Sequence, residues 1–264
     1  MQNSNVYGFC GFGCTAKMYD LLFQEIKNIS PEISLKALEN WNMGLGERAP
    51  ESHYSLQQLA EYFWNKIDNE LSTPNAKVHL VGVSMGGFIV QLMAALRPEK
   101  ISSLTLLCSL GPAQNGFILP QALTEAGLRF FHQLPLEQQA SLGTDATVHP
   151  LLKSRDPGTY QKIVDYRLQN TAKNVEDLIS QNSAALDFLN GKIDYSSISH
   201  LPTLILHGFD DRFVSRENAK IFQEKFPKSS VELISETDHF FFMEKPKVVA
   251  HSIVQFIQSA SVIL

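Results

Sequence analysis

A glycine-flanked serine near the middle of the chain constrains the fold more than any other feature. The pattern Gly-x-Ser-x-Gly occupies residues 82–86, after a short apolar run and before an apolar segment, residues 87–96, that has the composition of a helix. A strand, this turn and a helix in that order are what a nucleophile elbow requires. Glycines leave out side chains that would collide in so sharp a turn, and Ser84 is then exposed at a helix N-terminus, where the helix dipole favours negative charge. Taken alone, the pattern also fits a glycine-rich turn with an inert serine.

Short apolar runs alternate with helical patterns along most of the chain. The runs predict strands at 6–9, 33–38, 78–83, 104–108, 203–206 and 231–234. Amphipathic stretches between them predict helices, and this alternation is typical of a parallel sheet that is covered by helices on both faces. The expected fold class is therefore α/β, with a doubly wound, mainly parallel sheet of about six strands.

One long segment departs from this alternation. Between residues 112 and 192 the strand signal stops, and helical patterns appear at 121–133, 159–171 and 175–189, with prolines between them. One core formed by residues 1–111 and 193–264, with residues 112–192 inserted as a helical cap, explains the pattern better than two independent domains do.

Composition and charge exclude several classes of function. The chain has 264 residues and a formal net charge of −5, which argues against general binding to nucleic acid. It has no run of 18 apolar residues, so no membrane span is expected. Three cysteines without a CxxC pair, and a start without a signal sequence, predict free thiols and a cytoplasmic location. The scattered histidines lack metal-ligand spacing, and no metal site is predicted.

A candidate base and candidate acids follow the last two predicted strands. A serine nucleophile needs a base within hydrogen-bond reach and an acid that fixes the tautomer of the base. Asp210 and Asp211 come just past the strand at 203–206, and His239 comes just past the strand at 231–234. The loops at the carboxyl ends of parallel strands lie at one edge of the sheet, so these side chains are expected near Ser84. The chain order Ser, Asp, His is the order of this architecture.

The motifs together resemble the α/β-hydrolase superfamily, in particular its small esterases and lactonases with a helical cap. The resemblance covers nearly the whole chain, and its most specific parts are the segments 202–211 and 238–246. It implies Ser84 as nucleophile, Asp211 rather than Asp210 as the acid, and His239 as the base, with no cofactor. Asp210 is then expected to be a solvated loop residue, and His207 to pack at the end of its strand.

An oxyanion hole is the third requirement, because aimed donors stabilise the tetrahedral intermediate. One expected donor is the backbone N–H of Met85, directly after the nucleophile. The loop at residues 9–13 is similar to the family's His-Gly-x-Gly loop, which implies the N–H of Phe12 as the second donor and its ring as a wall of the acyl pocket.

Three departures from the family pattern stand out. Cys10 occupies the place where the family usually has histidine, and Asp238 replaces the glycine that commonly precedes the catalytic histidine. The first predicted strand begins almost at once, so the family's usual N-terminal hairpin is expected to be absent. We expect altered support of the oxyanion loop at Cys10, and at Asp238 either a carboxylate near His239 or a solvated side chain.

Aromatic residues supply the candidates for the substrate pocket, which are Phe12, Phe117, Phe130, Phe131 and Phe240. An apolar loop and cap imply a mostly hydrophobic pocket. The first interpretation is a serine hydrolase that cleaves a carboxylic ester of a small-to-medium acyl or aromatic acid, free or carrier-bound, through an acyl-enzyme. The resemblance also admits an enol-lactone hydrolase, a carbon–carbon bond hydrolase, a methyl esterase of a pimeloyl carrier protein and a cofactor-free haloperoxidase. A non-catalytic ligand receptor on the same fold is the alternative of another class.

Overall fold

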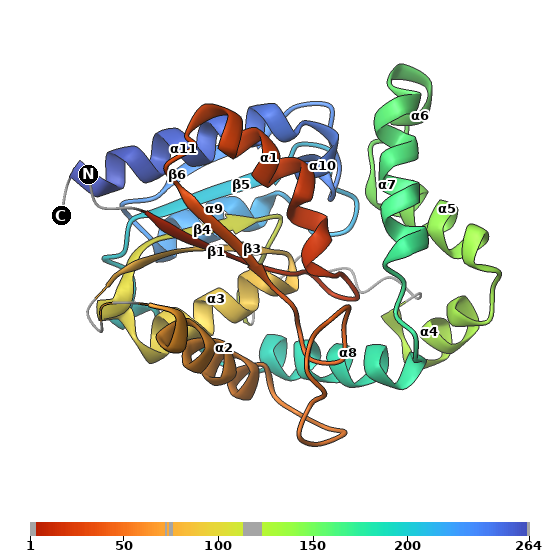
Figure 1. Ribbon diagram of the computed structural model, residues 1–264, viewed down its shortest axis with the longest axis horizontal. Helices are drawn as coiled ribbons and strands as arrows, with labels where there is room; N and C mark the ends of the chain where they lie inside the picture. Colours follow the sequence, from red (N-terminus) through yellow and green to blue (C-terminus); the bar gives the residue numbers. More distant parts are fainter. Residues whose placement is uncertain (1–3, 72, 74–75, 113–122, 263–264) are drawn as a thin grey trace.

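The computed structural model describes residues 4–71, 73, 76–112 and 123–262. A six-stranded sheet lies at its centre, in the order β2-β1-β3-β4-β5-β6, and every pair of neighbouring strands is parallel (Figure 1). The strands are β1 (Asn5–Phe9), β2 (Ser34–Leu38), β3 (Val78–Val83), β4 (Ile101–Leu107), β5 (Thr203–Gly208) and β6 (Ser230–Ile234). The predicted α/β fold with six parallel strands is confirmed.

Helices cover both faces of the sheet. They are α1 (Asp20–Ile29), α2 (Leu56–Glu70), α3 (Met85–Leu96), α4 (Glu125–His132), α5 (Leu136–Thr147), α6 (Leu152–Arg155), α7 (Pro157–Gln169), α8 (Val175–Asn190), α9 (Glu217–Lys225), α10 (Phe241–Glu244) and α11 (Pro246–Val262), with 3₁₀ turns η1 (Ala16–Tyr19), η2 (Pro98–Lys100) and η4 (Tyr195–Ser197). Among the helices of the described residues, none combines the length and the apolar character that crossing a bilayer requires.

Two apolar layers sandwich the sheet. In one layer, α2, α3 and α9 bury side chains such as Phe63, Phe88 and Phe222. In the other, α1 and α11 bury side chains such as Leu22 and Ile253. The interior strands β3, β4 and β5 are buried along their whole length, whereas the edge strands β2 and β6 are only partly buried. Continuous burial of central parallel strands explains why their sequences are mostly apolar, with polar residues such as His79 and Thr105 buried among them.

The start of α2 shows how the local sequence sets an element boundary. Ser55 precedes the helix, and its Oγ accepts a hydrogen bond from the backbone N–H of Gln58 at 3.1 Å. The Gln58 side chain accepts one in return from the Ser55 backbone N–H at 2.8 Å. This capping box satisfies two donors that a helix N-terminus leaves unpaired. Ser55 therefore marks the N-terminus of α2.

Helices α4 to α8 lie between β4 and β5 in the chain, and α4 to α7 stand beyond one end of the sheet (Figure 1). The predicted helices at 121–133, 159–171 and 175–189 correspond to α4, α7 and α8, although residues 121 and 122 lie outside the described part. The structure adds α5 and α6, which the sequence patterns did not predict. Helix α5 packs along α7, so its burial comes from a neighbour more than ten residues away.

Strand register brings the loops of interest to one level. Phe9 of β1 pairs with Gly82 of β3, Val83 pairs with Leu107 of β4, and Leu107 pairs with Leu206 of β5. The segments that leave β1, β3, β4 and β5 therefore emerge side by side at the carboxyl edge of the sheet. This edge is where ligand sites of parallel sheets are formed.

Candidate active site

Ser84 lies on a strained turn between β3 and α3. Its backbone adopts φ 53° and ψ −117°, a left-handed φ that side chains other than glycine rarely take. The Ser84 N–H donates to the Leu107 carbonyl at 2.8 Å, and the Ser109 hydroxyl donates to the Ser84 carbonyl at 2.9 Å. The turn is thus held from β4 while the Ser84 side chain stays partly exposed. This geometry is the one that the Gly-x-Ser-x-Gly pattern predicts.

The flanking glycines are required by close approach of backbone atoms. A Cβ atom at Gly86 would collide with the carbonyl oxygen of Phe9, and one at Gly82 would collide with the carbonyl oxygen of Gly86. The elbow therefore packs directly against the end of β1, where the candidate oxyanion loop begins. Neither glycine tolerates a larger residue without a backbone shift.

We expect Gly86→Ala to destabilise the protein by about 3 kcal/mol, because overpacking against backbone cannot relax by a rotamer change. Urea unfolding of the variant measures this loss. Gly158→Ala is the matched control, since its new Cβ would meet only Asp156 Oδ1 at an ordinary 3.4 Å. Equal stabilities of the two variants would contradict the packing described for the elbow.

Asp211 and His239 are in direct contact. Nδ1 of His239 lies 2.9 Å from Oδ2 of Asp211, and both side chains are buried. Oδ1 of Asp211 accepts hydrogen bonds from the backbone N–H groups of Phe213 and Val214, each at 2.8 Å. The carboxylate is therefore fixed by its own loop and presents its second oxygen to the imidazole. This arrangement leaves Nε2 as the nitrogen of His239 that does not contact Asp211.

The electrostatics of the pair favour an ion pair. Burial by itself raises the pKa of Asp211, but the charge of His239 and the hydrogen bonds of His207 and His239 outweigh it and hold the pKa well below its usual range. Burial lowers the pKa of His239, but its contacts with Cys108 and Asp211 raise the pKa well above its usual range. A carboxylate that stays ionised can orient the imidazole and stabilise its protonated form.

His207 is a second neighbour of the acid. Its Nε2 lies 3.1 Å from Oδ2 of Asp211 and 2.9 Å from the Val214 carbonyl. The predicted position at the end of a strand is observed, since His207 is buried in β5. Its contact with Asp211 was not predicted. His207 lies at the end of β5 and Asp211 lies in the loop that follows, so the two side chains meet only because this loop folds back towards the strand.

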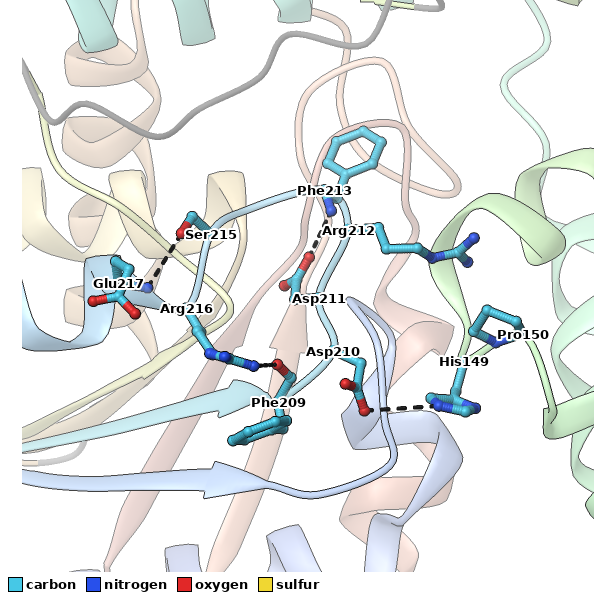
Figure 2. Close-up of a pocket in the computed structure, with 10 residues that line it drawn as sticks. All are labelled: His149, Pro150, Phe209, Asp210, Asp211, Arg212, Phe213, Ser215, Arg216 and Glu217. Atoms are coloured by element: carbon cyan, nitrogen blue, oxygen red, sulfur yellow. Dashed lines mark hydrogen bonds and ion pairs between the residues drawn. The ribbon is translucent and has the colours of Figure 1, made fainter.

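Asp210 faces away from this pair. Its side chain is 41% exposed, and Oδ2 lies 3.7 Å from His149 Nε2. A surface hollow of about 630 Å³ is lined by residues 149–150, 209–213 and 215–217. Figure 2 shows Asp210 and His149 facing each other among these residues. Asp211 lines this hollow, but Ser84 and His239 do not. The hollow alone therefore does not make a catalytic pocket.

Cys108 lies between the nucleophile turn and the imidazole. Its backbone has φ 42°, and its buried thiol contacts the backbone of Ser84 and the side chain of His239. Burial raises the pKa of Cys108, and the effects of His239 and of the Ser84 backbone oppose the shift without cancelling it. Because Ser84 and His239 both touch this one residue, the structure brings the predicted nucleophile and base to the same place.

Cys108, Asp211 and His239 are also the one cluster of potential metal ligands among the described residues. Donor atoms of Cys108, Asp211 and His239 lie within 4.8 Å of one another. Nδ1 of His239 already shares a proton with Asp211, so a metal bound there would displace the hydrogen bond between them. The group fits acid–base chemistry better than metal binding.

The candidate oxyanion loop packs beside Ser84. A Cβ atom at Gly11 would lie 3.6 Å from the Ser84 Cβ. Within the described part of the chain, neither the Phe12 nor the Met85 backbone N–H donates a hydrogen bond. Two unpaired donors beside a serine are what an oxyanion hole provides. Cys10 supports the loop through its thiol, which donates to the Leu38 carbonyl at 3.3 Å.

Asp238, the residue in place of the family's glycine, is completely buried. Its Oδ1 accepts hydrogen bonds from the backbone N–H groups of His239 at 2.8 Å and Arg212 at 2.9 Å. Oδ2 pairs with the Arg212 guanidinium, which also donates to the carbonyls of Asp145 and Val148 at 2.8 Å. Arg212 follows Asp211 and Asp238 precedes His239, so this ion pair ties together the two loops that carry the candidate acid and base.

Glu244 supports the same loop from α10. Its carboxylate accepts hydrogen bonds from the backbone N–H groups of Asp238 at 2.8 Å and His149 at 3.1 Å. Burial raises the pKa of Glu244 from 4.5 to about 7, although these hydrogen bonds oppose the shift. In the unfolded chain the group ionises near 4.5, so its stabilising contribution is lost as the pH rises towards 7.

We therefore expect Glu244→Gln to gain stability relative to the wild type between pH 5 and pH 8, by up to about 3 kcal/mol, because glutamine carries no buried charge. Urea unfolding of both proteins at several pH values measures the difference. Glutamine has one acceptor oxygen fewer than the carboxylate. This loss lowers the free energy of unfolding of the variant by an amount that does not depend on pH. A difference that stays constant across this range would contradict the raised pKa.

The predicted pocket residues separate into three groups. Phe117 lies outside the described residues. Phe130 is 67% exposed on α4, which does not fit a pocket wall, and we remove it from the candidate pocket. Phe12 and Phe131 are partly buried, and Phe240 is buried with its ring centroid 6.4 Å from that of His239. Phe213, which was not predicted, lies closer, with a centroid distance of 5.0 Å to His239.

The sequence was compared with models of known protein families. Residues 37–246 match the family model described as the alpha/beta hydrolase fold. The chain belongs to the α/β hydrolase family.

Individual relatives are distant. A monoacylglycerol lipase from Mus musculus is 26% identical over 194 residues, which is 69% of this chain and 55% of that protein. An uncharacterised hydrolase from Bacillus subtilis is 23% identical over 84% of this chain and 79% of its own length. A thermophilic esterase from Thermogutta terrifontis, solved with malate bound, superimposes with a TM-score of 0.76 at 18% identity and covers 98% of this chain and 90% of its own. The chain thus spans about half the length of the lipase it matches.

Proposed function

We propose that the protein is a serine hydrolase that cleaves carboxylic esters through an acyl-enzyme. The observation that carries the proposal is the 2.9 Å contact between His239 Nδ1 and Asp211, at the sheet edge where Ser84 occupies a strained elbow. Cys108 touches both Ser84 and His239, which gives the proposed nucleophile and base a common location. The lipase and esterase relatives support ester hydrolysis as the reaction.

The proposed steps use only residues of this chain. Ser84 Oγ attacks the ester carbonyl while its proton passes to Nε2 of His239, and Asp211 stabilises the imidazolium. The Phe12 and Met85 N–H groups hold the oxyanion of the tetrahedral intermediate. When the intermediate collapses, the C–O bond to the alcohol breaks and the alcohol leaves with the proton from His239. Water, deprotonated by His239, then attacks the acyl-enzyme and releases the acid.

Residues 112–192 are proposed to act as a cap over this edge. Helices α7 and α8 contact the oxyanion loop directly: Tyr166 accepts a hydrogen bond from the Thr15 N–H at 3.2 Å, and Gln181 accepts one from the Gly13 N–H at 2.6 Å. Substrate must therefore enter between these helices and the sheet edge. Aromatic walls at Phe12, Phe213 and Phe240 favour a small-to-medium acyl or aromatic acid.

A panel of p-nitrophenyl esters from acetate to laurate tests the proposed function and sizes the pocket. We expect turnover with an optimum at short or medium chains, because the aromatic residues beside His239 limit the apolar space. The release of p-nitrophenolate measures it. The absence of turnover on every ester, together with tight binding of one of them, would instead favour the non-catalytic receptor.

A further inference from the structure

Arg167 of α7 is a cation without an anionic partner. The structure describes no carboxylate within ion-pair distance of its guanidinium, and the undescribed segments 1–3, 72, 74–75, 113–122 and 263–264 contain no Asp or Glu. Nε is completely buried and has no hydrogen-bond partner. The side-chain hydrogen bond of the guanidinium runs from Nη2 to the neutral hydroxyl of Thr147 at 2.8 Å.

The other contacts of Arg167 are with uncharged groups, and the residue as a whole is partly exposed. Its Cζ lies 4.4 Å from the ring centroid of Phe240, and Nη1 would be 3.1 Å from a Cβ added at Gly143. Burial lowers the pKa of Arg167, and the groups that oppose this shift are Cys14 and Tyr166 rather than a carboxylate. A buried, unpaired charge costs several kcal/mol, and proteins usually pair it. Among the described residues, the Phe240 ring and the Thr147 hydroxyl offset part of this cost for Arg167, and neither carries a charge.

Arg167 is also close to the candidate catalytic residues. Phe240, on which the guanidinium lies, follows His239 directly in the chain. The Phe240 N–H donates to the carbonyl of Thr147, the residue that also binds Arg167. Cys14 is near both residues: burial raises its pKa, whereas the charge of Arg167, a hydrogen bond with Tyr166 and the charge of His239 lower it. Arg167 and His239 therefore share the Phe240 ring as a neighbour, at 4.4 Å from the guanidinium Cζ and 6.4 Å from the imidazole centroid.

We infer that Arg167 binds a carboxylate at the non-reacting end of the substrate, so that the esters cleaved are monoesters of short dicarboxylic acids. This inference rests on the proposed ester hydrolase function and specifies its substrate class. A guanidinium presents paired donors that match the two oxygens of a carboxylate. The buried Nε and the adjacent Nη group form such a pair of donors. A bound carboxylate supplies the missing partner, and the phenyl face of Phe240 keeps it away from water.

Kinetics on a matched pair of esters test the inference. Mono-p-nitrophenyl glutarate carries a carboxylate where p-nitrophenyl valerate carries a methyl group, so the ratio of their kcat/KM values isolates recognition of the charge. We expect Arg167→Gln to lower kcat/KM for the glutarate ester by about 10- to 100-fold, as loss of a charge-assisted pair does, and to change the valerate ester far less. Arg167→Lys keeps the charge but lacks the paired donors of the guanidinium, so its kcat/KM for the glutarate ester is expected to lie between those of the wild type and Arg167→Gln.

Arg155→Gln is the matched control, because Arg155 is a half-exposed arginine of α6 that pairs with Glu236 at 3.1 Å. It is expected to leave the ratio unchanged. If Arg167 has only a structural role, Arg167→Gln lowers kcat/KM for both esters equally, and that result would overturn the inference. A wild-type enzyme that prefers the valerate ester, with a ratio unaffected by Arg167→Gln, would overturn it as well.

A binding measurement separates this inference from the proposed function. Glutarate is titrated into the Ser84→Ala protein and into the Ser84→Ala, Arg167→Gln protein, with calorimetry as the readout. Binding that disappears with Arg167 supports the subsite even if neither ester is cleaved, in which case the hydrolase function fails alone. Equal binding to both proteins, or none to either, removes the subsite while leaving ester hydrolysis to be decided by the valerate kinetics.

Discussion

Replacing Ser84 by alanine is expected to reduce ester turnover by a factor of about 10⁴ or more, because the attacking oxygen is lost and only binding and oxyanion stabilisation remain. The fold is expected to survive. Among the described residues, none forms a hydrogen bond with Ser84 Oγ, so the substitution removes one partly exposed oxygen and no structural contact. Turnover of p-nitrophenyl butyrate and the unfolding midpoint measure the two effects.

Ser215→Ala provides the matched control for this substitution. Ser215 lies on the loop after β5, and its hydroxyl accepts only the Glu217 N–H at 3.3 Å. We expect this variant to turn over at the wild-type rate. Substantial activity in Ser84→Ala would show that the elbow serine is a structural residue and that the reaction takes place elsewhere.

Asp211→Asn is expected to lower kcat by about 10³- to 10⁴-fold. Asparagine keeps an oxygen for the N–H groups of Phe213 and Val214 but turns an amide towards His239. Two donors then face each other unless the imidazole changes tautomer, which places the proton on Nε2 and removes the base. The same change removes the carboxylate that raises the pKa of His239, so the acid limb of the kcat/KM profile should move to lower pH.

Asp210→Asn decides between the two neighbouring acids. The Asp210 carboxylate is 41% exposed and lies beside His149 rather than His239. Its replacement is expected to leave kcat close to the wild-type value. A larger loss in Asp210→Asn than in Asp211→Asn would mean that the acid loop takes another conformation when substrate is bound.

Much of the fold could be predicted because the central strands are buried on both faces. Residues 78–83 and 203–206 are mostly apolar for that reason, and strand register then brings their following loops together. The contact of Asp211 with His239 follows from the same register, since β5 and β6 are neighbours in a parallel sheet. Chain order and strand position thus predicted a contact between residues 28 positions apart.

Other features depend on tertiary contacts that local patterns do not encode. Helix α5 has a weak apolar periodicity and contains Gly143, yet it forms a helix because it packs along α7. The buried side chain of Asp238 is explained only by Arg212, which reaches it from another loop. Cys108 contacts His239 because its backbone takes a left-handed φ, which an apolar strand sequence does not indicate.

Covalent labelling with a fluorophosphonate, followed by peptide mass spectrometry, tests the central claim most directly. The reagent phosphonylates a serine only where a base activates it and an oxyanion site receives the new oxygen. The account predicts a single adduct, on Ser84, that fails to form in His239→Ala. An adduct on another residue, or an unlabelled Ser84 in a protein that still hydrolyses esters, would contradict the account.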